Sequence, residues 1–171
     1  MPHAFDYASS LWPTTPVEKF FPDLAIQHCQ QTGGSCVATG LSLLTRQPPE
    51  TVRQHINTQN PVSWSDYLQS HGMKLAYCPT DLRRLRFYRD ELLALDDLFA
   101  VSTYSADSAV QIGTDPDRDG WICGSHFVIL HRQTVYDTRD PSPILFEDYP
   151  DVSRYVKRLF RVVPASHHRG L

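Results

Sequence analysis

The residues best suited to covalent chemistry begin with a cysteine early in the chain. Cys36 follows Gly33-Gly34-Ser35 and opens a segment whose apolar residues recur with helical spacing. The thiolate is the competent nucleophile, and the positive end of a helix dipole favours this anion. Backbone N–H groups at a helix start can point at a developing oxyanion, and Gln30 could supply a second donor. The pattern predicts a nucleophile, with a buried cysteine at a helix start as the alternative.

A histidine late in the chain is the candidate general base. His126 enters an apolar strand, and a base of this kind needs an acceptor on its other ring nitrogen. If Arg132-Gln133 is the turn of the following hairpin, residue 126 faces 139. If Gln133-Thr134 is the turn, it faces 141. Either register favours Asp140 over Asp137 as the orienting acid, although a bulge would reverse this preference.

These two segments belong to elements of different kinds. Helical spacing predicts helices from residue 35, from residue 48, over 66–70, over 81–95 and over 152–159. Alternating or continuous apolar residues predict strands over 73–78, 98–103, 126–131, 134–138 and 160–163. Because helices come first and strands later, the order favours an α+β fold over a doubly wound α/β fold.

The order of these residues resembles a known superfamily. A glutamine six residues before a helix-opening cysteine, then a late histidine-led apolar strand and Asp140-Pro141, is similar to the papain-like cysteine peptidases. Within that superfamily the bacteriocin-processing peptidases are the most similar. The resemblance implies a Cys36 thiolate, a general base His126, an orienting Asp140 and an oxyanion donor Gln30. It also implies a papain-like fold, in which an N-terminal helical part with the nucleophile helix packs on a late antiparallel sheet.

The function implied by the resemblance is that of a thiol protease. Such an enzyme cleaves an amide or peptide bond of a protein or peptide substrate through a thioester, with no cofactor. The same triad also serves glutamine deamidases, transglutaminases and deubiquitinase-like bacterial effectors. A catalytically silent binding domain on the same fold is the alternative from another class. In this chain Thr32-Gly33-Gly34-Ser35 approach the cysteine, where the bacteriocin-processing enzymes have an Asp-Cys-Gly-x-x-Cys-like sequence.

Composition limits the classes of function. The 171 residues suit one domain over 1–171, with an irregular proline-rich arm over 1–22 and a flexible tail over 164–171. The net charge of −3 argues against a nucleic-acid binder. No apolar stretch approaches the ~20 residues of a membrane span, and no secretory signal precedes residue 10. We therefore expect a protein without membrane association, either cytoplasmic or secreted by a route that needs no signal peptide.

Two charged motifs compete with this interpretation. The sequence Asp115-x-Asp117-x-Asp119-Gly120 matches half of a calcium loop, but its twelfth position, which should be glutamate, is His126. We interpret it as an acidic turn and predict no metal. The basic residues between Arg83 and Arg89 are interpreted as a solvated helix face, with recognition of an acidic partner as the alternative. Cys29, Cys78 and Cys123 are predicted to serve packing.

Overall fold

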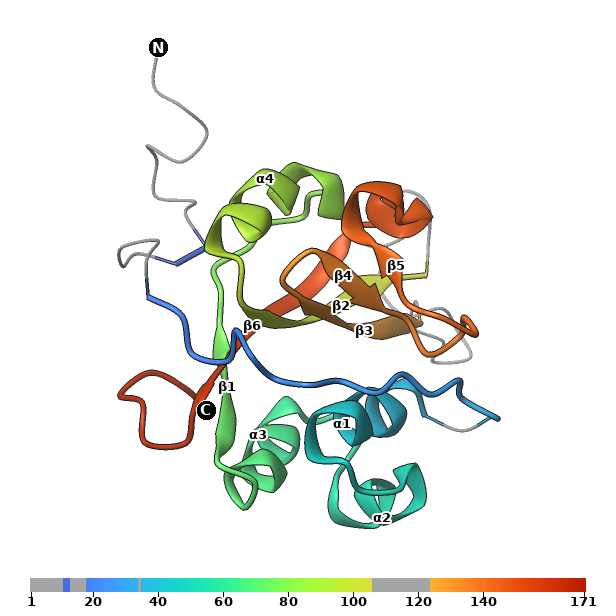
Figure 1. The fold of residues 1–171 in the computed structure, drawn as a ribbon, viewed down its shortest axis with the longest axis vertical. Coiled ribbons are helices and arrows are strands. Elements are labelled where there is room, and N and C mark those ends of the chain that lie inside the picture. The colour runs from blue at the N-terminus through green and yellow to red at the C-terminus, as the bar shows by residue number, and fades with distance from the viewer. Residues whose placement is uncertain (1–10, 13–17, 34, 106–123) are drawn as a thin grey trace, which may run out of the picture.

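The main feature of the fold is one antiparallel sheet with helices on both faces. The computed structural model describes residues 11–12, 18–33, 35–105 and 124–171 (Figure 1). Within them the strand order is β1-β6-β2-β3-β4-β5, and the α+β class is confirmed. The motif at 115–120 and Cys123 lie outside the described residues. The strands are β1 (Met73–Tyr77), β2 (Leu98–Tyr104), β3 (Ser125–His131), β4 (Thr134–Tyr136), β5 (Ile144–Leu145) and β6 (Val156–Pro164).

Each face of the sheet carries its own hydrophobic core. Helices α1 (Cys36–Thr45), α2 (Pro49–His55) and α3 (Pro61–Gln69) lie on one side, and α4 (Leu85–Leu95) lies on the other (Figure 1). Successive residues of β3 alternate between the two cores. Phe127 and Ile129 pack with α1 and α3, whereas Val128 and Leu130 pack with α4. The packing of Phe127 and Ile129 against α1 places β3, which carries His126, directly beside the helix that begins with Cys36.

The predicted helix over 152–159 is wrong. Only a short 3₁₀ turn, Pro150–Ser153, occurs there, and residues 156–164 form the strand between β1 and β2. This strand pairs on both edges and is covered on both faces, with Leu159 in one core and Phe160 in the other. A buried central strand is hydrophobic on both sides, so its apolar residues also match a helical spacing.

Two other helices start elsewhere than predicted. Helix α3 begins at Pro61, with the Asn60 side chain accepting a hydrogen bond from Val62 N, and is longer than the predicted 66–70. Helix α4 begins at Leu85 rather than at residue 81. The Asp81 carboxylate accepts a hydrogen bond from the Tyr88 hydroxyl at 2.7 Å and does not cap the helix.

The C-terminal tail is packed against the body rather than flexible. Ala165 N donates to Gly72 O at 3.0 Å, and Leu171 N donates to Leu75 O at 2.8 Å. The guanidinium of Arg169 lies 3.9 Å from the ring centre of Trp12, a residue of the N-terminal arm. The C-terminal tail is thereby held by contacts that are distant in sequence. This explains why a local pattern did not predict the order of the tail.

Candidate active site

Cys36 is the first residue of α1 and is half-buried. The preceding Ser35 is the N-cap, and its hydroxyl accepts hydrogen bonds from Val37 N and Ala38 N, both at 3.2 Å. The cap therefore satisfies the second and third amides of the helix and does not use the amide of Cys36. The thiol thus lies at the positive end of the helix dipole, as the sequence predicted.

Strand β4 ends at Tyr136, and this gives the Cys36 thiol a second hydrogen-bond partner, the backbone of Phe127. Arg132 N donates to Asp97 O and Ser105 N donates to Gly124 O, so the even-numbered residues of β3 bond to β2. The odd-numbered residues face β4, whose last residue, Tyr136, pairs with Ile129. In the described residues, Phe127 N–H therefore has no strand partner on this edge. Its backbone hydrogen bond goes to Cys36 instead.

His126 lies between the thiol and a carboxylate. Its Nε2 is 2.7 Å from Asp137 Oδ1, and its side chain also hydrogen-bonds Cys36. Because Nε2 faces the carboxylate, Nδ1 is the nitrogen left for the thiol. The imidazole is 13% exposed and the Asp137 side chain 0% exposed. The three side chains form a continuous Cys-His-Asp arrangement.

The electrostatics of this arrangement favour a charged pair. Burial raises the pKa of the Cys36 thiol, but hydrogen bonds from His126, Phe127 and the backbone of Cys36, with the charge of His126, lower it below its ordinary 9.0 overall. Burial lowers the pKa of His126, yet its bonds to Asp137 and Cys36 and the Asp137 charge raise it to about 9. Both shifts favour the charged form of each group, the thiolate of Cys36 and the imidazolium of His126.

The buried carboxylate of Asp137 is held from several sides. Its Oδ2 accepts from the Tyr149 hydroxyl at 2.7 Å and from Arg139 Nη2 at 2.9 Å, and its Oδ1 also accepts from Arg139 N at 3.0 Å. Arg139 Nη2 additionally pairs with Asp151. Burial raises the pKa of Asp137, but the bonds to His126, Arg139 and Tyr149 lower it well below its usual range. Asp137 is therefore a fixed anion.

The preference for Asp140 as the orienting acid is corrected by this geometry. Arg132-Gln133 is the hairpin turn, since His131 pairs with Thr134. Residues directly opposite in such a pair share a face, so odd-numbered residues after β4 share the face of His126 and residue 140 does not. Asp140 N instead donates to Asp137 O at 3.0 Å in a turn. The observed register is one of the two considered from the sequence, but the face of the sheet was not considered.

Gln30 is not placed beside the thiol by the hydrogen bonds of the described residues. Its amide Nε2 donates to Arg139 O at 2.9 Å, and the residue is exposed. The neighbouring Gln31 N donates to Thr138 O at 2.7 Å, so this segment lies along the turn that follows β4. A role for Gln30 in stabilising an oxyanion stays a prediction.

Three residues of the site were not found by sequence reasoning. Tyr149 follows a short 3₁₀ turn, Phe146–Asp148, which carries no motif, and Asp151 lies two residues later. Arg139 was close to the predicted acid, and its charge beside two aspartates was the one available signal. The arginines between Arg83 and Arg89 lie elsewhere. Of these, Arg83 is exposed and pairs with Asp81 as expected, but it precedes α4 and so is not part of a helix face; its guanidinium lies over the ring of Phe87.

Comparisons with known proteins identify no relative. No protein-family model, curated protein or solved structure matches the chain. Among the described residues, no group of three or more metal-ligating side chains could hold an ion, and no helix is long and apolar enough to cross a membrane. The function is therefore inferred from the geometry of the site.

Proposed function

We propose that the chain is a papain-like cysteine hydrolase that cleaves an amide or peptide bond of a protein or peptide substrate. The observation that supports it is the chain of contacts from Cys36 through His126 to the buried Asp137. A structural cysteine requires neither a histidine partner nor a lowered pKa. The helix start, the base and the fixed anion together match the requirements of an activated nucleophile.

The proposed reaction proceeds through a thioester. The Cys36 thiolate attacks the carbonyl carbon, and the carbonyl electron pair moves to oxygen. When the tetrahedral intermediate collapses, the amine leaves with a proton from the His126 imidazolium. His126, now neutral, accepts a proton from water as the water attacks the thioester, and the thiolate is released. Asp137 holds the ring in one orientation and stabilises its charged form throughout.

The start of α1 would also stabilise the oxyanion. The Ser35 hydroxyl bonds Val37 N and Ala38 N and does not bond the Cys36 N–H. The Cys36 N–H lies beside the reacting sulfur. Removing a single donor of this kind typically costs ~3–4 kcal/mol of transition-state stabilisation. Within this proposal, Gln30 is the second donor if its amide leaves Arg139 O when substrate binds. Loss of turnover in Gln30→Ala, with thiol reactivity unchanged, would support that role.

The decisive experiment compares two cysteine variants. Cys36→Ala should abolish turnover of a peptide library followed by mass spectrometry, while circular dichroism stays that of the wild type. Cys78→Ala, which changes a buried cysteine of the core on the other face of the sheet, should keep activity. Backbone cleavage supports a protease, a gain of about 1 Da indicates deamidation, and a crosslink indicates transamidation. An active Cys36→Ala protein would contradict the proposal.

A thiol probe separates the enzyme from a silent binding domain. Iodoacetamide should label Cys36 rapidly at mildly acidic pH. Burial raises the pKa of Cys78 to about 12, so this thiol should remain unlabelled. Slow, equal labelling of the cysteines would favour the binding domain.

A further inference from the structure

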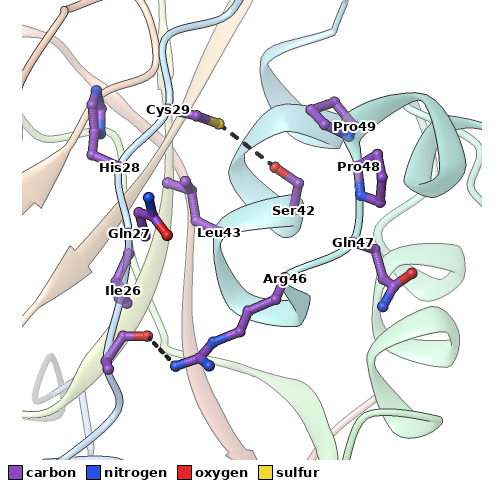
Figure 2. Close-up of a pocket in the computed structure, with 11 residues that line it drawn as sticks. Ile26, Gln27, His28, Cys29, Ser42, Leu43, Arg46, Gln47, Pro48 and Pro49 are labelled. Carbon is purple, nitrogen blue, oxygen red and sulfur yellow. Dashed lines mark hydrogen bonds between the residues drawn. The ribbon is translucent and has the colours of Figure 1, made fainter.

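A groove lies beside the second half of α1, separate from the Cys36 thiol. Figure 2 shows it between the extended segment 25–29 on one side and Pro48-Pro49 on the other, with Ser42 and Leu43 of α1 between them. Its volume is about 540 Å³. Sites for ligands of moderate size occupy roughly 300–1,000 Å³, so the groove has room for a short stretch of peptide.

The wall formed by residues 25–29 has the character of a strand without a partner. The backbone is bonded on either side of this stretch, by Leu24 N to Phe21 O and by Gln31 N to Thr138 O. Within the described part of the chain, the main-chain groups of residues 26–29 form no hydrogen bond. The segment crosses the helices in an extended path (Figure 1). Such an edge can accept an added strand, whose main chain then satisfies the exposed N–H and C=O groups.

The charge of the groove selects the kind of peptide. Among the residues that line it, Arg46 is the one lysine or arginine, and there is no aspartate or glutamate. One of its Nη atoms donates to Ala25 O at 3.3 Å, a long bond that leaves the other donors of the guanidinium available. Arg46 is exposed and follows α1, ten residues after Cys36. An anionic side chain is therefore the complementary group at this end.

We propose that this groove binds an extended segment of the substrate as an added strand along residues 25–29, with an acidic side chain at Arg46. The assignment rests on the proposed hydrolase function. Ten residues of helix span about 15 Å, which an extended peptide covers in about four or five residues. The acidic residue of the substrate is therefore about four or five residues from the bond that Cys36 attacks.

Binding is tested on the Cys36→Ala protein, so that no probe is consumed. The probes are fluorescent hexapeptides of valine and threonine that carry one Asp, Asn or Lys. We expect the Asp peptides to bind roughly tenfold tighter than the Lys peptides. Arg46→Glu should reverse this preference. Arg53→Glu, which changes an exposed arginine of α2 outside the groove, should leave it unchanged.

A second measurement tests the added strand. Two versions of the Asp peptide are methylated on its backbone nitrogens, one at the odd positions and one at the even positions. Only one of these sets faces the protein strand, so methylation of that set should abolish binding and methylation of the other should not. Equal binding of Asp and Lys peptides, a preference that survives Arg46→Glu, or binding indifferent to both methylation patterns would overturn the proposal. Turnover and Cys36 alkylation in the wild type are measured separately. Failure of the groove with intact turnover would therefore leave the hydrolase standing.

Discussion

Two aspartates in the described part of the chain, Asp97 and Asp137, are fully buried, and their partners differ. Asp97 accepts hydrogen bonds from Phe20 N and Phe21 N at 2.9 Å and pairs with Arg161, which is itself 0% exposed. Asp137 pairs with His126 and with Arg139, whose side chain is 48% exposed. Asp97 faces only backbone amides and a permanent cation. Asp137 faces a group that titrates beside a thiol.

The two ion pairs differ in what they hold in place. The Arg161 guanidinium lies 4.6 Å from the ring centre of Phe20 and 4.9 Å from that of Trp12, so the Asp97 pair holds the N-terminal arm onto the sheet. The Asp137 pair lies at an edge of β3 where the ladder has ended. Burial alone therefore does not identify a functional carboxylate. The better indication of a functional carboxylate is the group to which it is bonded and how exposed that group is.

The largest effect on stability should come from breaking the Asp97 pair. Arg161→Met leaves a buried carboxylate without its cation, and we expect a loss of about 3–5 kcal/mol in the free energy of unfolding, measured in urea. The matched control Arg132→Met breaks the exposed pair with Asp96 and should cost less than about 1 kcal/mol. Alkylation of Cys36 in the folded fraction should not change in either variant.

The largest effect on chemistry should come from Asp137→Asn. Loss of the anion removes the charge that stabilises the imidazolium, so turnover should fall roughly a hundredfold or more. The pKa of His126, measured by NMR, should fall from about 9 toward its ordinary 6.5. If this variant lost stability as Arg161→Met does and kept its Cys36 reactivity, Asp137 would be a structural residue like Asp97.

The pH dependence of stability should also distinguish the two pairs. The pKa of His126 is raised from 6.5 to about 9, so its stabilising contribution is complete below 6.5 and is lost as pH rises through about 9. His126→Gln should remove this dependence from the unfolding free energy. Asp97→Asn removes the buried charge that pairs with Arg161 and does not touch His126, so it should lower stability and leave this slope unchanged.

Tyr149→Phe should have a smaller effect. It removes one hydrogen bond to a charged acceptor and should cost about 1.5–3 kcal/mol of stability. Because the lowered pKa of Asp137 stabilises the fold above 3.8, this contribution is lost as pH falls. In the variant the folded-state pKa of Asp137 is less depressed, so the loss still begins near 3.8 but is smaller and complete at a higher pH. Unfolding curves recorded between neutral and acid pH provide the measurement, and an unchanged acid limb would contradict a role for Tyr149.

The smallest effect on stability is expected for Arg139→Gln, because the side chain of Arg139 is half exposed. We expect a loss of less than about 1 kcal/mol. The charge of Arg139 lowers the pKa of His126, so its removal should raise that pKa further above 9. Arg139→Lys keeps the charge and should keep the pKa. A fall in the His126 pKa in Arg139→Gln would show that Arg139 acts mainly by orienting Asp137.

The sequence predicted the local parts of the site better than their assembly. A helix-opening cysteine and a two-residue hairpin turn depend on neighbouring residues, and each was predicted where it occurs. The first part of β6, residues 156–159, was assigned to a helix because its apolar residues serve two cores at once, whereas residues 160–163 were predicted as a strand. Gln30 was assigned a role from spacing alone, and its hydrogen bond to Arg139 could not be derived from that spacing.

The sequence by itself determined that Cys36 begins a helix and that His126 enters a buried strand, because capping and apolar patterning act within a few residues. Only the tertiary structure decided that Asp137, rather than Asp140, is the carboxylate bonded to His126. That choice depends on which face of the sheet a residue occupies, on β4 ending at Tyr136, and on Tyr149 and Arg139 reaching one buried carboxylate. Such contacts join segments distant in sequence, and no local pattern records them.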